Sequence, residues 1–197
     1  MRLSPGTTSQ ICYATFDLRL AAQNWARAAG AGPFFLMELP AGLEKTYRGE
    51  RAHDSFQAAI GFMGTTCIEL MQPTNEAPSI IREILDARGE GAVQHMYPHI
   101  RPLDAGQYDE MCAKYKAMGL EEALSFRVPG MGRNAFFDAR RTLGCFLEVL
   151  EFGTDAYESV LGGMYESHCS WDGSDPIRSM DSLQGTPTPG ETTRRRT

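Results

Sequence analysis

The sequence predicts an α+β protein made of two βαβββ modules that share one core. The order of one strand, one helix and then further strands occurs in the first half and again in the second. In both halves an Asp stands where the helix should begin and a Gly where it should end. The closing strands also match, since IELMQ at 68–72 and LEVLE at 147–151 have apolar and polar residues at the same positions.

The first module is expected over about 8–73. A strand is predicted at 10–16, and Asp17 is the expected N-cap of a helix that ends at the turn 30–33. The apolar residues of this helix recur at helical spacing: Leu18, Ala21, Trp25 and Ala28. Further strands are predicted at 34–39, 44–49, 55–63 and 67–72.

The second module is expected over about 91–152. It begins with a predicted strand at 95–101, followed by Asp104 as the N-cap of a helix that ends at Gly119. Its further strands are predicted at 122–128, 134–139 and 145–152. The sequence therefore contains the same element order twice.

We expect one domain over 1–182 and a disordered tail over 183–197. A linker helix with apolar residues on one side is predicted within 74–90, and it should pack on the outside of the sheet. The C-terminal extension 153–182 is predicted to begin with a helix around 154–167. The tail is rich in Pro, Thr, Gly and Arg, a composition that is typical of disorder.

Composition and charge favour an ordinary globular protein. Of its 197 residues, 42% are hydrophobic and 22% charged, and the net charge of −6 argues against a nucleic-acid partner. An export signal and a long apolar run are both missing, so we expect a cytoplasmic protein without a membrane partner. The five cysteines are odd in number and lack CxxC spacing, which indicates reduced thiols that serve in packing.

Four polar residues occupy matching strand positions and form a candidate metal site. They are Gln10 and Glu69 in the first module and His95 and Glu148 in the second. Carboxylates inside a barrel are costly to bury unless a cation compensates them. One imidazole, two carboxylates and one amide oxygen suit divalent Zn, Ni, Co, Mn or Mg.

Simpler interpretations of these residues remain open. Strand alternation also allows Glu69 and Glu148 to face solvent, and His95 can be a hydrogen-bonded core histidine. Their arrangement as a repeat is the reason to prefer the metal site.

Several segments together resemble the glyoxalase and bleomycin-resistance superfamily, whose members are also called vicinal oxygen chelate proteins. They are QICYATFDL, GAGPFF, CIELMQP, the HMYPHI segment before Asp104, and GCFLEVLEF. The resemblance covers about 8–152 and implies a barrel of paired βαβββ modules. It also implies that Gln10, Glu69, His95 and Glu148 are the four metal ligands. The opening segment and the GPFF turn look most like methylmalonyl-CoA epimerase, whereas Gln at the first ligand position is similar to one form of glyoxalase I.

The resemblance implies an enzyme that removes a proton next to a carbonyl group. The metal would stabilise the charge that develops, and Glu148 or Glu69 would act as the general base. An isomerase, an epimerase or a lyase is compatible with this chemistry. Ten methionines and many aromatic residues suggest an apolar cavity for a bulky hydrophobic or CoA-linked small molecule.

Two other functions remain open. One is a noncatalytic small-molecule binding or resistance protein, although relatives of that kind often lack the ligands. The other is a ring-cleaving dioxygenase, which Gln10 disfavours because the iron site of such enzymes uses two histidines and one carboxylate. The segment WDGSDPIR at 171–178 lies beyond the repeat and is predicted to form a clasp on the barrel surface, at a contact in a homodimer. Capping of the pocket is the alternative role of this segment.

Overall fold

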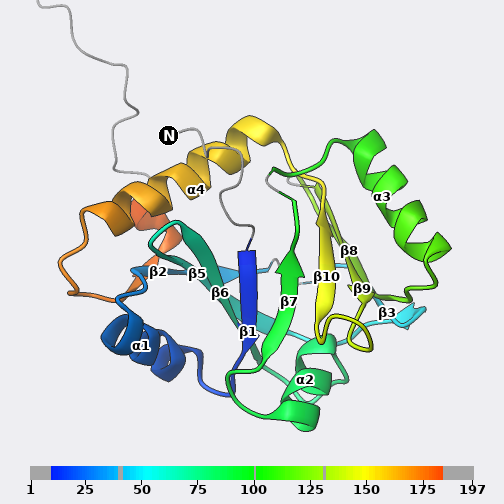
Figure 1. The fold of residues 1–197 in the computed structure, drawn as a ribbon, viewed down its shortest axis with the longest axis horizontal. Coiled ribbons are helices and arrows are strands. Elements are labelled where there is room, and N and C mark those ends of the chain that lie inside the picture. Colours follow the sequence, from blue (N-terminus) through cyan, green and yellow to red (C-terminus); the bar gives the residue numbers. More distant parts are fainter. Residues whose placement is uncertain (1–9, 40–41, 100, 131, 184–197) are drawn as a thin grey trace, which may run out of the picture.

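The computed structural model describes residues 10–39, 42–99, 101–130 and 132–183 (Figure 1). Within them one mixed sheet of eleven strands has the order β11-β2-β5-β6-β1-β7-β10-β9-β8-β3-β4. Four α-helices and one short 3₁₀ helix surround the sheet in the described ranges. The predicted α+β class is confirmed.

The first module supplies one half of the sheet. Its elements are β1 (Gln10–Ala14), α1 (Leu18–Ala29), β2 (Phe34–Glu38), β5 (Phe56–Met63) and β6 (Thr66–Pro73). Strand β5 pairs antiparallel with both β2 and β6, and β6 pairs parallel with β1. These strands agree with the predicted segments to within a few residues at either end.

The second module repeats this pattern. Its elements are β7 (Val93–Tyr97), α3 (Ala105–Ala117), β8 (Glu122–Val128), β9 (Gly132–Asp138) and β10 (Phe146–Leu150). Strand β9 pairs antiparallel with β8 and β10, and β10 pairs parallel with β7. The two modules join where β1 and β7 pair antiparallel, so the pairing pattern is symmetric about the centre of the sheet.

Short strands extend both edges of the sheet. The hairpin of β3 (Lys45–Tyr47) and β4 (Glu50–Arg51) belongs to the first half of the chain but pairs with β8 of the second module. At the opposite edge, β11 (Ile177–Ser179) pairs parallel with β2. The segment predicted as one strand at 44–49 is therefore a hairpin, and β11 was not predicted.

The helix boundaries follow the predicted caps. Asp17 accepts a hydrogen bond from the Leu20 backbone N–H at 2.9 Å, and Gly30 ends α1 with a left-handed φ of 62°. Asp104 and Gln107 form a reciprocal capping box at the start of α3. Both Asp residues are thus N-caps, as their place before the apolar stripes predicts.

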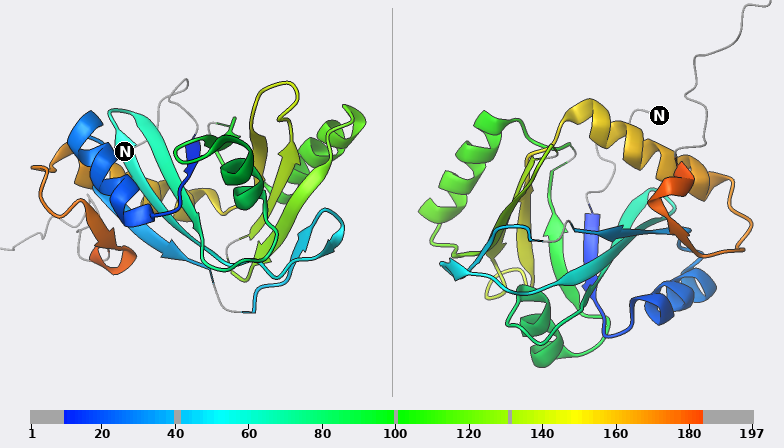
Figure 2. Two further views of the ribbon diagram at one scale, coloured as in Figure 1. Left: turned by 90° about the horizontal axis from the view of Figure 1, so that it is seen from below. Right: turned by 180° about the vertical axis from the view of Figure 1, so that it is seen from behind.

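The helices cover both faces of the sheet (Figure 2). On β6, Ile68 and Leu70 pack with α1, whereas Cys67 and Met71 belong to clusters on the opposite face. Strand alternation produces this division. Helix α3 covers the second module in the same way, packing with Leu147 and Val149 of β10.

Helix α2 (Ile80–Arg88) was predicted on the outside of the sheet but packs on the face that carries the buried donor residues. Its buried residues Ile80, Ile81, Ile84 and Leu85 share a cluster with Cys12, Met71 and Phe146. These partners lie on the face opposite α1 and α3, so the prediction of an outside helix is wrong. The apolar periodicity identifies the buried side of a helix, but both faces of this sheet offer an apolar surface.

The strand that opens the second module spans Val93–Tyr97 instead of 95–101. Pro98 follows it and cannot donate a ladder hydrogen bond, which accounts for its end. His95 therefore lies in the middle of β7 rather than at its start.

The C-terminal extension contains α4 (Thr154–Cys169), β11 and a 3₁₀ helix (Met180–Leu183). Helix α4 packs through Leu161 and Met164 against Phe35, Ile60 and Phe62 of the first module. Of the predicted tail, Leu183 belongs to the 3₁₀ helix and 184–197 lie outside the described residues. No helix in the described ranges combines the length and apolar composition of a membrane span.

Arg48 ties the β3–β4 hairpin to the rest of the fold. Its φ is 47°, in the left-handed region, and its guanidinium pairs with Glu83 of α2, Glu121 and Asp138 of β9 at 2.8 Å each. Hydrogen bonds from Arg140 and Arg48 lower the pKa of Asp138. Burial opposes ionisation of Glu83, but hydrogen bonds from Arg48 and Tyr47 outweigh it and lower its pKa.

We expect Arg48→Gln to lower the free energy of unfolding by about 1–3 kcal/mol, because it leaves partly buried carboxylates without their cation. Arg101→Gln should change it by less than about 0.5 kcal/mol, since the Arg101 side chain is 53% exposed beside Glu158. Carboxyls with a lowered pKa in the folded state stabilise it above their unfolded pKa, and this stability is lost as pH falls below about 4. Urea unfolding at pH 7 and pH 3 measures the free energy of unfolding of the unmodified protein and both variants. The difference between Arg48→Gln and the unmodified protein should be smaller at pH 3 than at pH 7, and a difference that stays the same would contradict this account of Arg48.

All five cysteines are free thiols, and they should differ in reactivity. Cys169 is exposed and Cys112 half-buried, so these two should react first with a thiol reagent in the native protein. The other three, Cys12, Cys67 and Cys145, are buried and should react only on unfolding. Mass spectrometry after labelling without reductant should count two fast thiols and, in denaturant, five; a count of three or one in denaturant would contradict the unpaired state.

Candidate metal centre

The strand register brings the four predicted residues together. Gln10 pairs with Cys67, two residues before Glu69, on the parallel strands β1 and β6. In the second module His95 pairs with Phe146, two residues before Glu148, on β7 and β10. Gln10 is thus equivalent to His95 and Glu69 to Glu148, and the central β1–β7 pairing places all four on the same face.

Their side chains converge around the imidazole of His95. His95 Nε2 lies 3.1 Å from Glu69 Oε2 and 3.4 Å from Glu148 Oε2, and Gln10 Nε2 donates a hydrogen bond to Glu69 Oε2. Glu69 and Glu148 are only 7% and 6% exposed, so they do not face solvent. The solvent-facing interpretation of these two carboxylates is therefore excluded.

His95 is buried between the carboxylates, with the Phe136 ring edge-on at 5.0 Å. Burial opposes protonation of the imidazole, but Cys12, Glu148 and Glu69 favour it and raise the pKa of His95 well above its usual value. A proton on His95 thus compensates part of the buried negative charge. A cation in its place would serve the same electrostatic purpose.

The residues fit a divalent metal ion. His95 Nε2 has no hydrogen-bond partner among the described residues, although it is buried. Donor atoms around an octahedral ion with bonds of about 2.1 Å are about 3 Å apart, close to the 3.1 and 3.4 Å separations here. Asn134 Nδ2 donates to Glu148 Oε1 at 3.1 Å and so orients that carboxylate from behind.

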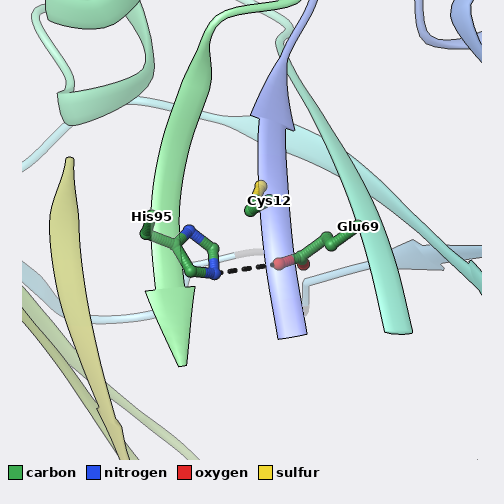
Figure 3. A group of neighbouring side chains, drawn as sticks. All are labelled: Cys12, Glu69 and His95. Atoms are coloured by element: carbon green, nitrogen blue, oxygen red, sulfur yellow. Dashed lines mark ion pairs between the residues drawn. The ribbon is translucent and has the colours of Figure 1, made fainter. Parts of the chain in front are cut away.

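Cys12 also belongs to this site, and it was not predicted there. It is fully buried on β1, and its Sγ lies within 4.8 Å of donor atoms of Glu69 and His95 (Figure 3). Burial raises the pKa of the Cys12 thiol to about 12, while the neighbouring His95 opposes this rise. Cys12 follows Gln10 by two residues, and this same-face spacing was the signal that an assignment to packing alone overlooked.

Helix α4 covers part of the face beside the site. Tyr157 packs into the cluster that contains Cys67, Leu161 and Met164. Burial raises the pKa of Tyr157, and so do the neighbouring groups Cys67, Tyr97, Glu148 and Glu69. The C-terminal extension thus forms part of the surroundings of the four donor residues.

The apolar residues expected to line a substrate cavity are mostly packed in the core. Phe62, Met71 and Phe136 are each 2% exposed and belong to core clusters. A cavity of about 670 Å³ lies elsewhere, between α3, β8 and the β3–β4 hairpin, and Arg127 and Lys116 are among its lining residues.

Comparison with solved structures identifies proteins of the same fold. A comparison with protein-family models gives no match, and neither does one with curated proteins. Two structures of Streptomyces coelicolor methylmalonyl-CoA epimerase, both single-residue variants in complex with 2-nitronate-propionyl-CoA, are each 20% identical to this chain. Each alignment covers 76% of this chain and 99% of the epimerase, with TM-scores of 0.50 and 0.51. The likeness shows that this chain has the paired βαβββ fold of the glyoxalase-like, or vicinal oxygen chelate, proteins.

Proposed function

We propose that the protein is a metal-dependent isomerase or epimerase that removes a proton next to a carbonyl group. One observation carries this proposal: His95 Nε2 lies between two buried carboxylates on equivalent strands. Such a cluster is costly to bury unless it performs chemistry or binds a cation. The position of all four donor residues at the centre of the sheet supports one shared site.

Gln10, Glu69, His95 and Glu148 would hold the ion. Their nitrogen and oxygen donors suit Zn, Ni, Co, Mn or Mg, and a sulfur donor from Cys12 would shift the preference toward Zn or Co. When bound, a divalent ion stabilises negative charge on substrate oxygen atoms and so acidifies the adjacent carbon.

The two carboxylates are the candidate bases. Glu69 is oriented by Gln10 and His95, which both contact Oε2. Glu148 is oriented by Asn134 at Oε1 and faces His95 with Oε2. A carboxylate that takes a proton from one face of a carbon and a second group that returns it to the other face would epimerise that carbon.

A CoA-linked substrate is the best-supported choice. The two Streptomyces coelicolor epimerase structures of this fold are complexes with 2-nitronate-propionyl-CoA. A CoA thioester also provides the carbonyl group that acidifies the neighbouring carbon. A bulky hydrophobic carbonyl compound fits the same chemistry, and a lyase step would begin with the same proton removal.

A small-molecule binding protein is the second candidate function. The cavity of about 670 Å³ between α3, β8 and the β3–β4 hairpin favours it, because none of the four donor residues is among the residues that line this cavity. A ring-cleaving dioxygenase is less compatible with the site, since Gln10 stands where its second histidine would be required.

We further propose that the protein is cytoplasmic and that it forms a homodimer.

We expect the metal-free protein to bind about one zinc or cobalt ion per chain, with release of the His95 proton. His95→Ala should lose most of this binding, whereas His53→Ala should keep it because His53 is exposed in the loop between β4 and β5. Calorimetry and metal analysis of protein purified without a nickel column measure the stoichiometry. Equal metal content in all three proteins would contradict the proposed centre, and no binding in any of them would favour the binding protein.

Glu69→Gln and Glu148→Gln should separate the base from the second carboxylate. Each change keeps an oxygen ligand and the side-chain size but removes the base, and loss of a positioned base typically costs about 10²–10⁴-fold in rate. The measurement is hydrogen–deuterium exchange at the acidic carbon of a methyl-branched acyl-CoA, with metal content determined on the same samples. The base is the residue whose variant loses exchange while keeping its metal; unchanged exchange in both variants would contradict the mechanism.

A further inference from the structure

A β-bulge at the centre of the sheet lies next to the candidate metal centre. In the β1–β7 pairing, Cys12 pairs with His95 and Tyr13 pairs with Val93, so Gln94 is an extra residue without a partner. Adjacent residues of a regular strand point to opposite faces. The bulge removes this restriction, and the Gln94 side chain contacts its neighbour: Oε1 lies within hydrogen-bond distance of His95 Nδ1.

The burial of Gln94 is difficult to explain by packing alone. Its exposed fraction is 0%, and its Nε2 has no hydrogen-bond partner among the described residues. An unpaired amide N–H group away from water is costly, and an apolar side chain of similar size would avoid this cost. The amide oxygen, in contrast, has one specific partner, the imidazole of His95.

We infer that Gln94 is a positioning residue, which accepts the Nδ1–H hydrogen bond of His95 and thereby orients the ring so that Nε2 faces the space between Glu69 and Glu148. The inference rests on the proposed metal centre, because it assigns Nε2 as the ligand atom. Gln94 itself touches neither the ion nor the substrate. A histidine that binds a metal through one nitrogen needs an acceptor for the proton on the other, and this acceptor fixes the tautomer and the ring orientation.

Asn134 orients Glu148 in a similar way. Its Nδ2 donates to Glu148 Oε1 at 3.1 Å, while the other oxygen of Glu148 faces His95. Both donor residues of the second module are therefore oriented by an amide side chain. In the first module Gln10 and Glu69 contact each other instead.

Two substitutions at Gln94 have opposite expected effects. Gln94→Met keeps the side-chain length but removes the acceptor, so zinc binding should weaken by about 10–100-fold. Gln94→Glu keeps an acceptor oxygen, and zinc binding should stay equal or become tighter. If Gln94 served packing alone, Gln94→Glu would weaken zinc binding more than Gln94→Met, because a buried carboxylate disrupts a core more than a methionine does. Gln57→Met is the control, since Gln57 bonds to Glu38 on β2.

A second measurement needs no metal. In the metal-free protein, ¹⁵N-histidine spectra report the two ring nitrogens of His95 separately, so the Nδ1–H that Gln94 is inferred to accept is observed directly. The Nδ1–H resonance should move upfield in Gln94→Met and stay downfield in Gln94→Glu, as expected for loss and retention of a hydrogen bond. A resonance that is the same in all three proteins would overturn the inference.

The two readouts separate this inference from the proposed function. If the unmodified protein binds no zinc but its Nδ1–H resonance depends on Gln94, the metal centre is wrong and the orienting contact stands. If zinc binds but neither its affinity nor the resonance responds to Gln94→Met, the metal centre stands and the role of Gln94 is wrong.

Discussion

The antiparallel pairing of β1 with β7 is the constraint on which the rest of the structure depends. It joins the two modules and sets His95 directly beside Cys12, with Gln10 and Glu69 on one side and Glu148 on the other. A slip of this pairing by one residue would turn one set of donor side chains to the opposite face. The charged cluster and the apolar packing therefore depend on the same register.

The two faces of the sheet differ in the residues they carry and in the helices that cover them. One face is apolar and carries α1 and α3, each packed on its own module. The other face carries the buried carboxylates, with α2 and α4 packed on the apolar residues around them. This surrounding apolar layer keeps the carboxylates away from bulk water. Burial opposes protonation of His95, but the neighbouring groups outweigh it and raise its pKa, and the same low-dielectric surroundings strengthen any interaction with a cation.

Short strands added at both edges of the sheet make the fold more than two packed repeats. The β3–β4 hairpin leaves the first module to pair with β8, and Arg48 then anchors it to α2 and β9. The opposite edge is completed by β11 from the C-terminal extension. The repeat accounts for the symmetric centre of the sheet, whereas these additions give the two edges different structures.

The sequence by itself determined the local elements and the equivalence of the two modules. Asp17 and Asp104 identify helix starts because a side-chain cap is a local interaction, and the alternation around Glu69 and Glu148 reveals the repeated strand. Only the tertiary structure decided which face α2 covers, that Cys12 joins the four donors, and that Gln94 reaches His95 through a bulge. These features depend on register and on contacts between distant strands, and periodicity along one segment does not encode how that segment pairs with another.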